Sequence, residues 1–283
     1  MISTTEIERL NREFAQAVVR LPSGAQISVR MRGTPGQGPS VLLLHGISSG
    51  AASWLHTVGH MAPHTHVVAW DAPGYGTSTP LPSAAPTADD YATQLHAMVQ
   101  ALGLSSTLVV GHSLGCLMGA AYARQSTPQQ VPRLVLISPA GGYGAPGKAE
   151  AQARVRAQRR DALETLGVAG IASRIDQRLL SPNATEEARA WVRWNASLLK
   201  DDGYLQAVEL LCGADLGAGP ALQMPVEVHC GAMDVVTTPE ASALWAQVLG
   251  ATYAPIVAAG HASPTEQPEA VALLIERALA ACE

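Results

Sequence analysis

The chain has 283 residues, of which 47% are apolar and 14% are charged, so it has the composition of a folded protein and not of a disordered one. Its length fits one large domain, or one domain that carries an insertion. The net charge of −5 provides no basic field for a phosphate backbone, which argues against nucleic acid as a partner and favours a small-molecule ligand.

The opening residues, MISTTEIERLNRE, mix acidic and basic side chains and lack the apolar stretch of a signal peptide. Apolar runs elsewhere in the chain are far shorter than a membrane span. We therefore expect a cytoplasmic protein with no membrane partner. The four cysteines are scattered without a CxxC pair, which argues against a zinc knuckle or a disulfide framework.

The first elements predicted are a short amphipathic helix and an antiparallel hairpin. Thr5 and Glu8 have the spacing of a capping box at the start of that helix. Apolar and polar residues then alternate over 17–21 and 26–31, on either side of a Pro-Ser-Gly turn. The hairpin is expected at a sheet edge.

After the loop GTPGQGPS (33–40), the apolar segments become continuous. They are VLLLHG (41–46), HVVAWDAPG (66–74), STLVVGHS (106–113), RLVLISPA (133–140), PVEVHCGAMD (225–234) and ATYAPIVAAGH (251–261). Continuous runs are typical of strands covered on both faces, and helix-sized stretches such as 87–102 and 114–126 separate them. The predicted class is α/β, with a mostly parallel sheet of eight strands flanked by helices.

Residues 141–216 contain no convincing strand. Three helical segments are predicted there, at 148–166, 185–199 and 204–211, and glycine-rich and proline-containing stretches border the region on both sides. We interpret this region as a helical cap inserted into a core formed by residues 1–140 and 217–283.

The segment GHSLG (111–115) has the pattern G-x-S-x-G directly after a predicted strand and directly before a predicted helix. Glycines permit the sharp strand-to-helix turn that exposes a nucleophilic serine, here Ser113. A serine hydroxyl needs a base and a group that orients the base. Asp234 ends a late strand and His261 follows the last one, although a helix N-cap and a surface histidine are their alternative roles.

The order Ser113, Asp234, His261 and three further motifs resemble the α/β-hydrolase family with a helical cap. The other motifs are the HG turn at His45 and Gly46, the DAPGYGTS loop (71–78), and the acid and base segments GAMD and AGH. The resemblance implies a Ser-His-Asp triad, with oxyanion-hole N–H groups from Ile47 and Leu114. It implies no cofactor and no metal.

Ser113 argues against the relatives that use an aspartate nucleophile, such as haloalkane dehalogenases and epoxide hydrolases. The leading hypothesis is a serine hydrolase that cleaves, through an acyl-enzyme, an ester or lactone of a small molecule that is either neutral or acidic. The same triad also cleaves carbon-carbon bonds in ring-cleavage acids, although HGISSGAASW and GHSLGC depart from the motifs of those enzymes. The third hypothesis is a noncatalytic ligand-binding module.

Several side chains could contact a substrate. Lys148, Arg154, Arg156, Arg159 and Arg160 predict a solvated helix face, with steering of an acidic substrate as the alternative, and Arg174, Arg178, Arg189 and Arg193 are further candidates for binding a carboxylate. The candidate substrate-binding residues are His45, Gly46, Trp191 and Trp194, although the two tryptophans fit packing of the cap better.

His56 and His60 have i, i+4 spacing, but Pro63 interrupts the segment and the nearby sequence has no acidic pair. We therefore expect a surface helix there and no metal site. A homo-oligomer stays open, because one chain does not show which exposed apolar residues form an interface.

Overall fold

A computed structural model describes residues 2–36 and 39–282, so residues 37 and 38 of the predicted loop 33–40 lie outside the description. The described chain forms an eight-stranded sheet in the order β1-β2-β4-β3-β5-β6-β7-β8. The strands are β1 (Ala15–Arg20), β2 (Gln26–Arg32), β3 (Ser40–Leu44), β4 (Val67–Trp70), β5 (Thr107–His112), β6 (Leu134–Ile137), β7 (Val226–Gly231) and β8 (Thr252–Ile256). The predicted α/β class is confirmed.

The sheet is antiparallel at one side and parallel elsewhere. β2 pairs antiparallel with both β1 and β4, and every other neighbouring pair from β4 to β8 is parallel. The hairpin β1–β2 therefore lies at the edge, as its alternating sequence predicts. Parallel pairing directs the carboxyl ends of β3 to β8 to the same edge of the sheet.

The sheet separates two apolar clusters. Leu42 and Leu44 belong to one cluster, and Val41 and Leu43 belong to the other. Successive side chains of a strand point to opposite faces, and all of these side chains are fully buried. This explains why the central strands have continuous apolar sequences.

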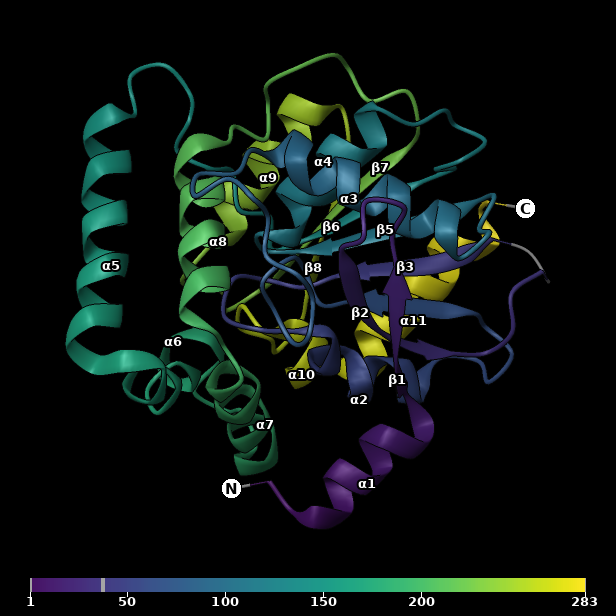
Figure 1. Cartoon of the computed structure of the whole chain (residues 1–283), viewed down its shortest axis with the longest axis horizontal. Coiled ribbons are helices and arrows are strands. Elements are labelled where there is room, and N and C mark those ends of the chain that lie inside the picture. Colours follow the sequence, from purple (N-terminus) through teal and green to yellow (C-terminus); the bar gives the residue numbers. More distant parts are fainter. Residues whose placement is uncertain (1, 37–38, 283) are drawn as a thin grey trace.

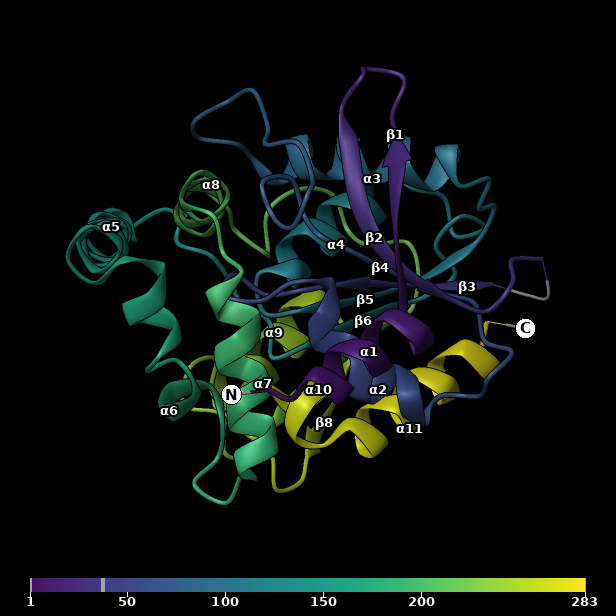
Figure 2. The same cartoon turned by 60° about the horizontal axis from the view of Figure 1, so that its bottom comes forward.

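Helices cover both faces of the sheet (Figures 1 and 2). The cluster that contains Leu42 includes side chains of α3 (Ala88–Ala101), α4 (Gly115–Arg124) and α9 (Pro239–Leu249). The other cluster includes side chains of α1 (Thr4–Glu13), α2 (Leu55–His60) and α11 (Pro268–Ala280). Two short helical segments, η1 (Ala51–Trp54) and α10 (Ser263–Glu266), lie in the loops.

The first helix begins earlier than its sequence predicts. Its capping box is Ser3 with Glu6, and not Thr5 with Glu8: the Glu6 N–H donates to Ser3 Oγ at 3.2 Å and the Ser3 N–H donates to Glu6 Oε2 at 2.8 Å. Both pairs have the required spacing, so spacing alone did not distinguish them. Thr5 is instead a residue of the first helical turn.

Between β6 and β7 lie the four helices α5 (Ala149–Ala172), α6 (Asp176–Leu179), α7 (Glu186–Ser197) and α8 (Asp201–Gly213). We call α5–α8 the cap helices; the exact division at residues 141 and 216 stays a prediction. α5 bends at Gly167, which has a φ of 60°. Figures 1 and 2 both show α5 at the outer side of the molecule, with α8 between α5 and the core.

The cap helix α8 lies directly against a core loop. A Cβ atom on Gly203 would lie 2.2 Å from the carbonyl oxygen of Gly74, so only glycine permits this approach. Nearby, the amide of Gln206 donates to the carbonyl oxygens of Leu81 and Ser83 at 2.7 and 2.8 Å. These contacts hold the cap over the carboxyl edge of the sheet. No helix among the described residues is long and apolar enough to span a membrane.

Candidate active site

The three predicted triad residues meet at the carboxyl edge of the parallel sheet. Ser113 follows β5, Asp234 follows β7 and His261 follows β8, although 148 residues separate Ser113 from His261 in sequence. These residues are 6%, 3% and 4% exposed, respectively. The strand order therefore brings together groups that the sequence predicted only from their types and order.

Ser113 occupies a strained turn between β5 and α4. Its φ is 54°, a left-handed conformation that is uncommon outside glycine. The flanking glycines make the turn sterically possible, because a Cβ on Gly115 would lie 2.3 Å from the carbonyl oxygen of Leu44 and one on Gly111 would lie 2.7 Å from that of Gly115. The turn therefore presents the Ser113 hydroxyl at the start of a helix.

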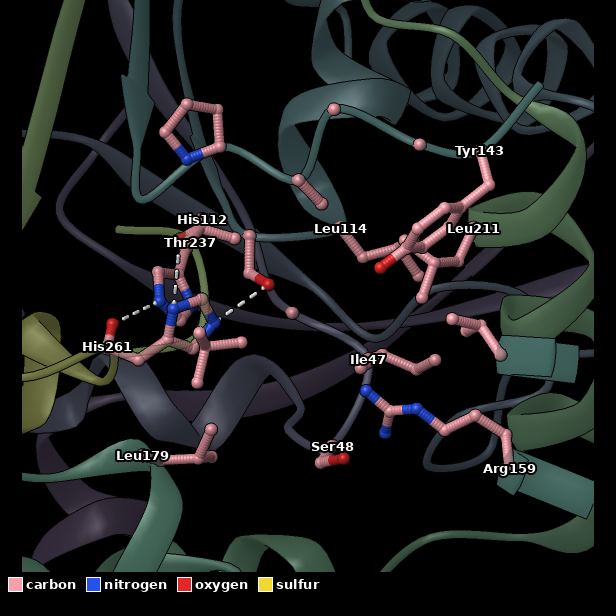
Figure 3. Close-up of a pocket in the computed structure, with 18 of the residues that line it drawn as sticks. Ile47, Ser48, His112, Leu114, Tyr143, Arg159, Leu179, Leu211, Thr237 and His261 are labelled. Atoms are coloured by element: carbon pink, nitrogen blue, oxygen red, sulfur yellow. Dashed lines mark hydrogen bonds between the residues drawn. The ribbon is translucent and has the colours of Figure 1, made fainter. Parts of the chain in front are cut away.

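A continuous hydrogen-bond relay joins the three side chains. Figure 3 shows His261 at the cavity, with His112 and Thr237 beside it. His261 Nε2 lies 2.9 Å from Ser113 Oγ, and His261 Nδ1 lies 2.8 Å from Asp234 Oδ2. An ionised carboxylate only accepts hydrogen bonds, so Nδ1 carries the proton that it donates to Asp234. Nε2 is then the acceptor that faces the serine hydroxyl.

The surroundings of Asp234 keep its carboxyl group ionised. Burial alone would raise its pKa, but the hydrogen bond and charge of His261 and the N–H groups of Val236 and Thr237 lower that pKa well below its usual range. Those two N–H groups donate to Oδ1 at 2.7 and 3.0 Å. Asp234 thus remains a hydrogen-bond acceptor for the imidazole at neutral pH.

Thr237 and His112 also hold the relay, although no role was predicted for either from the sequence. The Thr237 hydroxyl donates to Asp234 Oδ2 at 3.0 Å and lies 3.2 Å from His261 Nδ1. His112 Nε2 donates to the backbone carbonyl of His261 at 2.8 Å. Burial lowers the pKa of His112 to about 3, so its ring is neutral and holds the His261 loop without adding charge. The position of His112 directly before Ser113 in the sequence is the signal that could have indicated this role.

The backbone N–H groups of Ile47 and Leu114 have no acceptor among the residues that the structure describes. Both residues line the cavity beside Ser113, and the HG turn lies close, since a Cβ on Gly46 would be 3.0 Å from Ser113 Cβ. Tyr75 fixes this turn by donating to the Ile47 carbonyl oxygen at 2.7 Å. Free N–H groups at this place are suited to bind a developing oxyanion.

The loop 71–78 supports the site from outside the cavity. Asp71 accepts hydrogen bonds from the Ser28 hydroxyl and the Ala51 N–H, both at 2.8 Å. His45 is buried: its Nε2 accepts from the Ala72 N–H at 3.0 Å, so its Nδ1 donates to the Gly46 carbonyl oxygen at 2.8 Å. His45 therefore braces the HG turn and does not line the cavity, which corrects its assignment as a substrate-binding candidate.

Trp191 and Trp194 also lie outside the lining of this cavity. Trp191 is fully buried, and its ring packs against those of Trp194 and His56, with centroids 4.8 and 4.9 Å away. Their substrate-binding assignment is corrected to packing between cap and core. Gly46 alone of the four candidates lines the cavity.

The cavity next to Ser113 has a volume of about 320 Å³. On the core side, Ser113 and His261 line this cavity. On the cap side, its lining includes Lys148, Arg159 and Arg178. Of the other basic candidates, Arg189 and Arg193 pair with Asp176 at 3.6 and 3.3 Å and do not line the cavity. No acidic side chain lines the cavity within residues 2–36 and 39–282.

Outside the cavity, one group of side chains has the composition of a metal site. Ligand atoms of Glu6, His56 and Glu187 lie within 4.8 Å of one another. The acidic pair that the sequence around His56 lacks is supplied by α1 and α7, which contribute Glu6 and Glu187. All three belong to elements that do not line the cavity.

Comparisons with known proteins show the fold and the family of this chain. A monoacylglycerol lipase of Xenopus laevis is 35% identical over 117 residues, which are 39% of this chain and 33% of the lipase. The chain spans about a third of the length of the curated relatives that it matches first.

Among solved structures, the enol-lactonase from Burkholderia xenovorans LB400 superposes with a TM-score of 0.80 at 23% identity, over 93% of this chain and 100% of that one. An esterase from Exiguobacterium antarcticum has a TM-score of 0.80 at 17% identity, over 94% and 98% of the two chains. These likenesses show a shared fold. A family model described as alpha/beta hydrolase fold matches residues 39–268, and the chain belongs to the α/β-hydrolase family.

Proposed function

We propose that this protein is a serine hydrolase that cleaves a carboxylic ester or lactone through an acyl-enzyme. The observation that carries the proposal is the unbroken relay from Ser113 Oγ through His261 to Asp234, at 2.9 and 2.8 Å. The names of the relatives support it, because a monoacylglycerol lipase, an enol-lactonase and an esterase all imply a carboxylic ester bond.

In the first half of the reaction, Ser113 Oγ attacks the carbonyl carbon while His261 Nε2 takes the hydroxyl proton. The carbonyl π electrons move to oxygen, and the N–H groups of Ile47 and Leu114 bind the resulting oxyanion. Asp234 stabilises the imidazolium that forms. The tetrahedral intermediate then collapses, and His261 gives its proton to the departing alkoxide.

In the second half, water enters the site that the alcohol has left. His261 Nε2 removes a proton from this water, whose oxygen attacks the acyl carbon. A second tetrahedral intermediate expels Ser113 Oγ, which takes the proton back from His261. The products are a carboxylic acid and an alcohol, or one hydroxy acid when the substrate is a lactone.

The experiment compares initial rates of the wild type and Ser113→Ala on short-chain nitrophenyl esters, an enol lactone and a dienol ring-cleavage acid. We expect Ser113→Ala to reduce ester or lactone turnover by roughly 10⁴- to 10⁶-fold. Ser105→Ala is the matched control, since Ser105 is exposed and lies in a loop.

Near wild-type turnover by Ser113→Ala would overturn the proposal. Rapid loss of the dienol acid with inert esters would instead assign carbon-carbon bond hydrolysis, the alternative that the same triad permits. A folded protein that hydrolyses none of the three classes and resists a fluorophosphonate label would leave a noncatalytic binding module as the better assignment.

A further inference from the structure

The cavity has opposite characters on its two sides. The core side presents the uncharged Ser113 hydroxyl and the relay behind it, whereas the cap side presents the cations Lys148, Arg159 and Arg178. Since no carboxylate of the described chain lines this space, the positive charge in the cavity has no counter-charge there.

Helix α5 shows which of its arginines are already neutralised. Glu209 of α8 pairs with Arg156 at 3.0 Å and with Arg160 at 2.8 Å. These two arginines are four residues apart and share one face of α5. The Glu209 carboxylate is therefore fully engaged between the two helices, on a face next to the one that lines the cavity.

Arg159 lies on that neighbouring face and has no acidic partner in the described part of the chain. Its only hydrogen bond there runs from Nη1 to the Tyr204 hydroxyl at 3.3 Å, and Tyr204 is 1% exposed. Figure 3 shows the Arg159 guanidinium extending from the cap into the cavity, toward Ile47. A buried tyrosine thus orients a half-buried cation toward the candidate oxyanion hole.

Lys148 and Arg178 add to the positive charge in the cavity, and neither forms an ion pair within the described residues. Lys148 Nζ lies 5.9 Å from the Trp245 ring and 3.4 Å from the Gly142 carbonyl oxygen, which are uncharged neighbours. Arg178 has no ion pair within the described residues. A partly enclosed site of one charge sign attracts ligands of the opposite sign.

We propose that the substrate is an ester or lactone that carries a carboxylate, and that Arg159 binds this carboxylate while Ser113 attacks the scissile carbonyl. A carboxylate matches the planar guanidinium fork, which binds it through two parallel hydrogen bonds. Lys148 and Arg178 raise the local concentration of the anion. The assignment rests on the proposed hydrolase function and names the substrate class for the same cavity.

The test uses two matched ester pairs. In the first, the nitrophenyl monoester of glutaric acid is compared with the nitrophenyl ester of glutaric acid methyl ester, so that only the acyl-side charge differs. In the second, 4-butyryloxybenzoate is compared with 4-butyryloxybenzamide, so that only the alcohol-side charge differs. For one pair, we expect the wild type to prefer the charged member by about tenfold or more in kcat/KM.

Arg159→Gln should reduce that preference to about twofold or less, mainly through a higher KM for the charged ester. Arg160→Gln is the matched control, because it removes the same charge one residue away while its partner Glu209 still pairs with Arg156. We expect it to retain the preference. The preference of the wild type should also weaken as salt is added.

Equal kcat/KM values for charged and neutral esters in both pairs, or an unchanged preference in Arg159→Gln, would overturn the inference and leave the hydrolase proposal intact. If no ester is hydrolysed, calorimetry of glutarate with the wild type, Arg159→Gln and Arg160→Gln still tests the anion site. Binding that Arg159→Gln alone abolishes would support it, and absence of binding to the wild type would contradict it.

Discussion

The sheet core and the outermost cap helix, α5, differ in how much of their chains is buried. Every residue of β3, β4, β5 and β6 is buried, whereas only Leu163 and Ala172 are buried among the 24 residues of α5. The residues of the relay follow strands of the sheet, whereas Arg159, the unpaired arginine that lines the cavity, belongs to α5. A rigid sheet keeps reacting atoms within hydrogen-bond distance, while exposed helices can change substrate contacts at little cost to folding.

This contrast predicts that core and cap substitutions have different kinetic signatures. A change in the relay should lower turnover of every substrate by the same factor, because the chemistry is common to all of them. A change in the cap should alter the ratio between substrates.

The largest effect is expected for Asp234→Asn. An amide no longer holds a negative charge against the imidazolium and allows the wrong tautomer of His261, so kcat should fall by about 10⁴-fold. The fall should be equal for charged and neutral esters. Steady-state kinetics on both esters check it, with the exposed cap residue Asp202→Asn as control. A loss of less than tenfold would remove Asp234 from the relay.

The contact between α8 and the core loop is tested by Gly203→Ala. The added methyl group would meet the Gly74 backbone at 2.2 Å, so the cap must shift, and we expect a loss of about 1–3 kcal/mol in unfolding free energy. The preference among esters should change with it. Gly213→Ala on the same helix is the control, because nothing lies within 4 Å of its added Cβ.

Urea denaturation measures the stability of the two variants. The ratio of kcat/KM for charged and neutral esters measures their substrate preference. Equal stabilities of the two variants would show that α8 does not depend on the close approach at Gly74. An unchanged ester ratio in a destabilised Gly203→Ala protein would mean that the seating of the cap does not set specificity.

The third effect concerns acid. Burial lowers the pKa of His112 from 6.5 to about 3, so between these values the unfolded chain binds one more proton at this site than the folded protein. Stability is therefore fully present above pH 6.5 and falls as the pH is lowered, by up to about 1.4 kcal/mol per pH unit from this group. His45, whose pKa burial also lowers, acts in the same direction.

Residues 141–216 contain no histidine, so this acid sensitivity belongs to the core. Urea midpoints measured from pH 7 to pH 4 should show a smaller pH dependence for His112→Asn than for the wild type. An identical slope would indicate that His112 titrates normally in the folded protein. The exposed His64→Asn variant is the control and should retain the wild-type slope.

The core was the part of the molecule that the sequence predicted best. Buried parallel strands have continuous apolar sequences, and the strained turn at Ser113 needs glycines at fixed positions, so both leave local signals. Asp234 and His261 could be predicted as triad residues because each follows a predicted strand. Their hydrogen bonds depend on the strand order, which no local pattern contains.

The roles of His112, His45 and Arg159 could not be predicted from local sequence, because each role depends on contacts between distant segments. His112 donates to the carbonyl of His261, 149 residues later in the chain. His45 was a substrate-binding candidate, but its Nε2 instead accepts a hydrogen bond from Ala72 of another loop. Arg156, Arg159 and Arg160 look alike in the sequence, and only the position of Glu209 on α8 distinguishes the unpaired Arg159.

The most direct test of the relay is to trap the acyl-enzyme. Wild-type protein is mixed with excess nitrophenyl acetate, quenched in acid within milliseconds to seconds, and digested for mass spectrometry. We predict one added acetyl group on the peptide that contains Ser113, formed at the rate of the nitrophenol burst and absent in His261→Gln. Release of nitrophenol with an unmodified Ser113, or acetyl groups spread over other residues, would contradict an acyl-enzyme at Ser113.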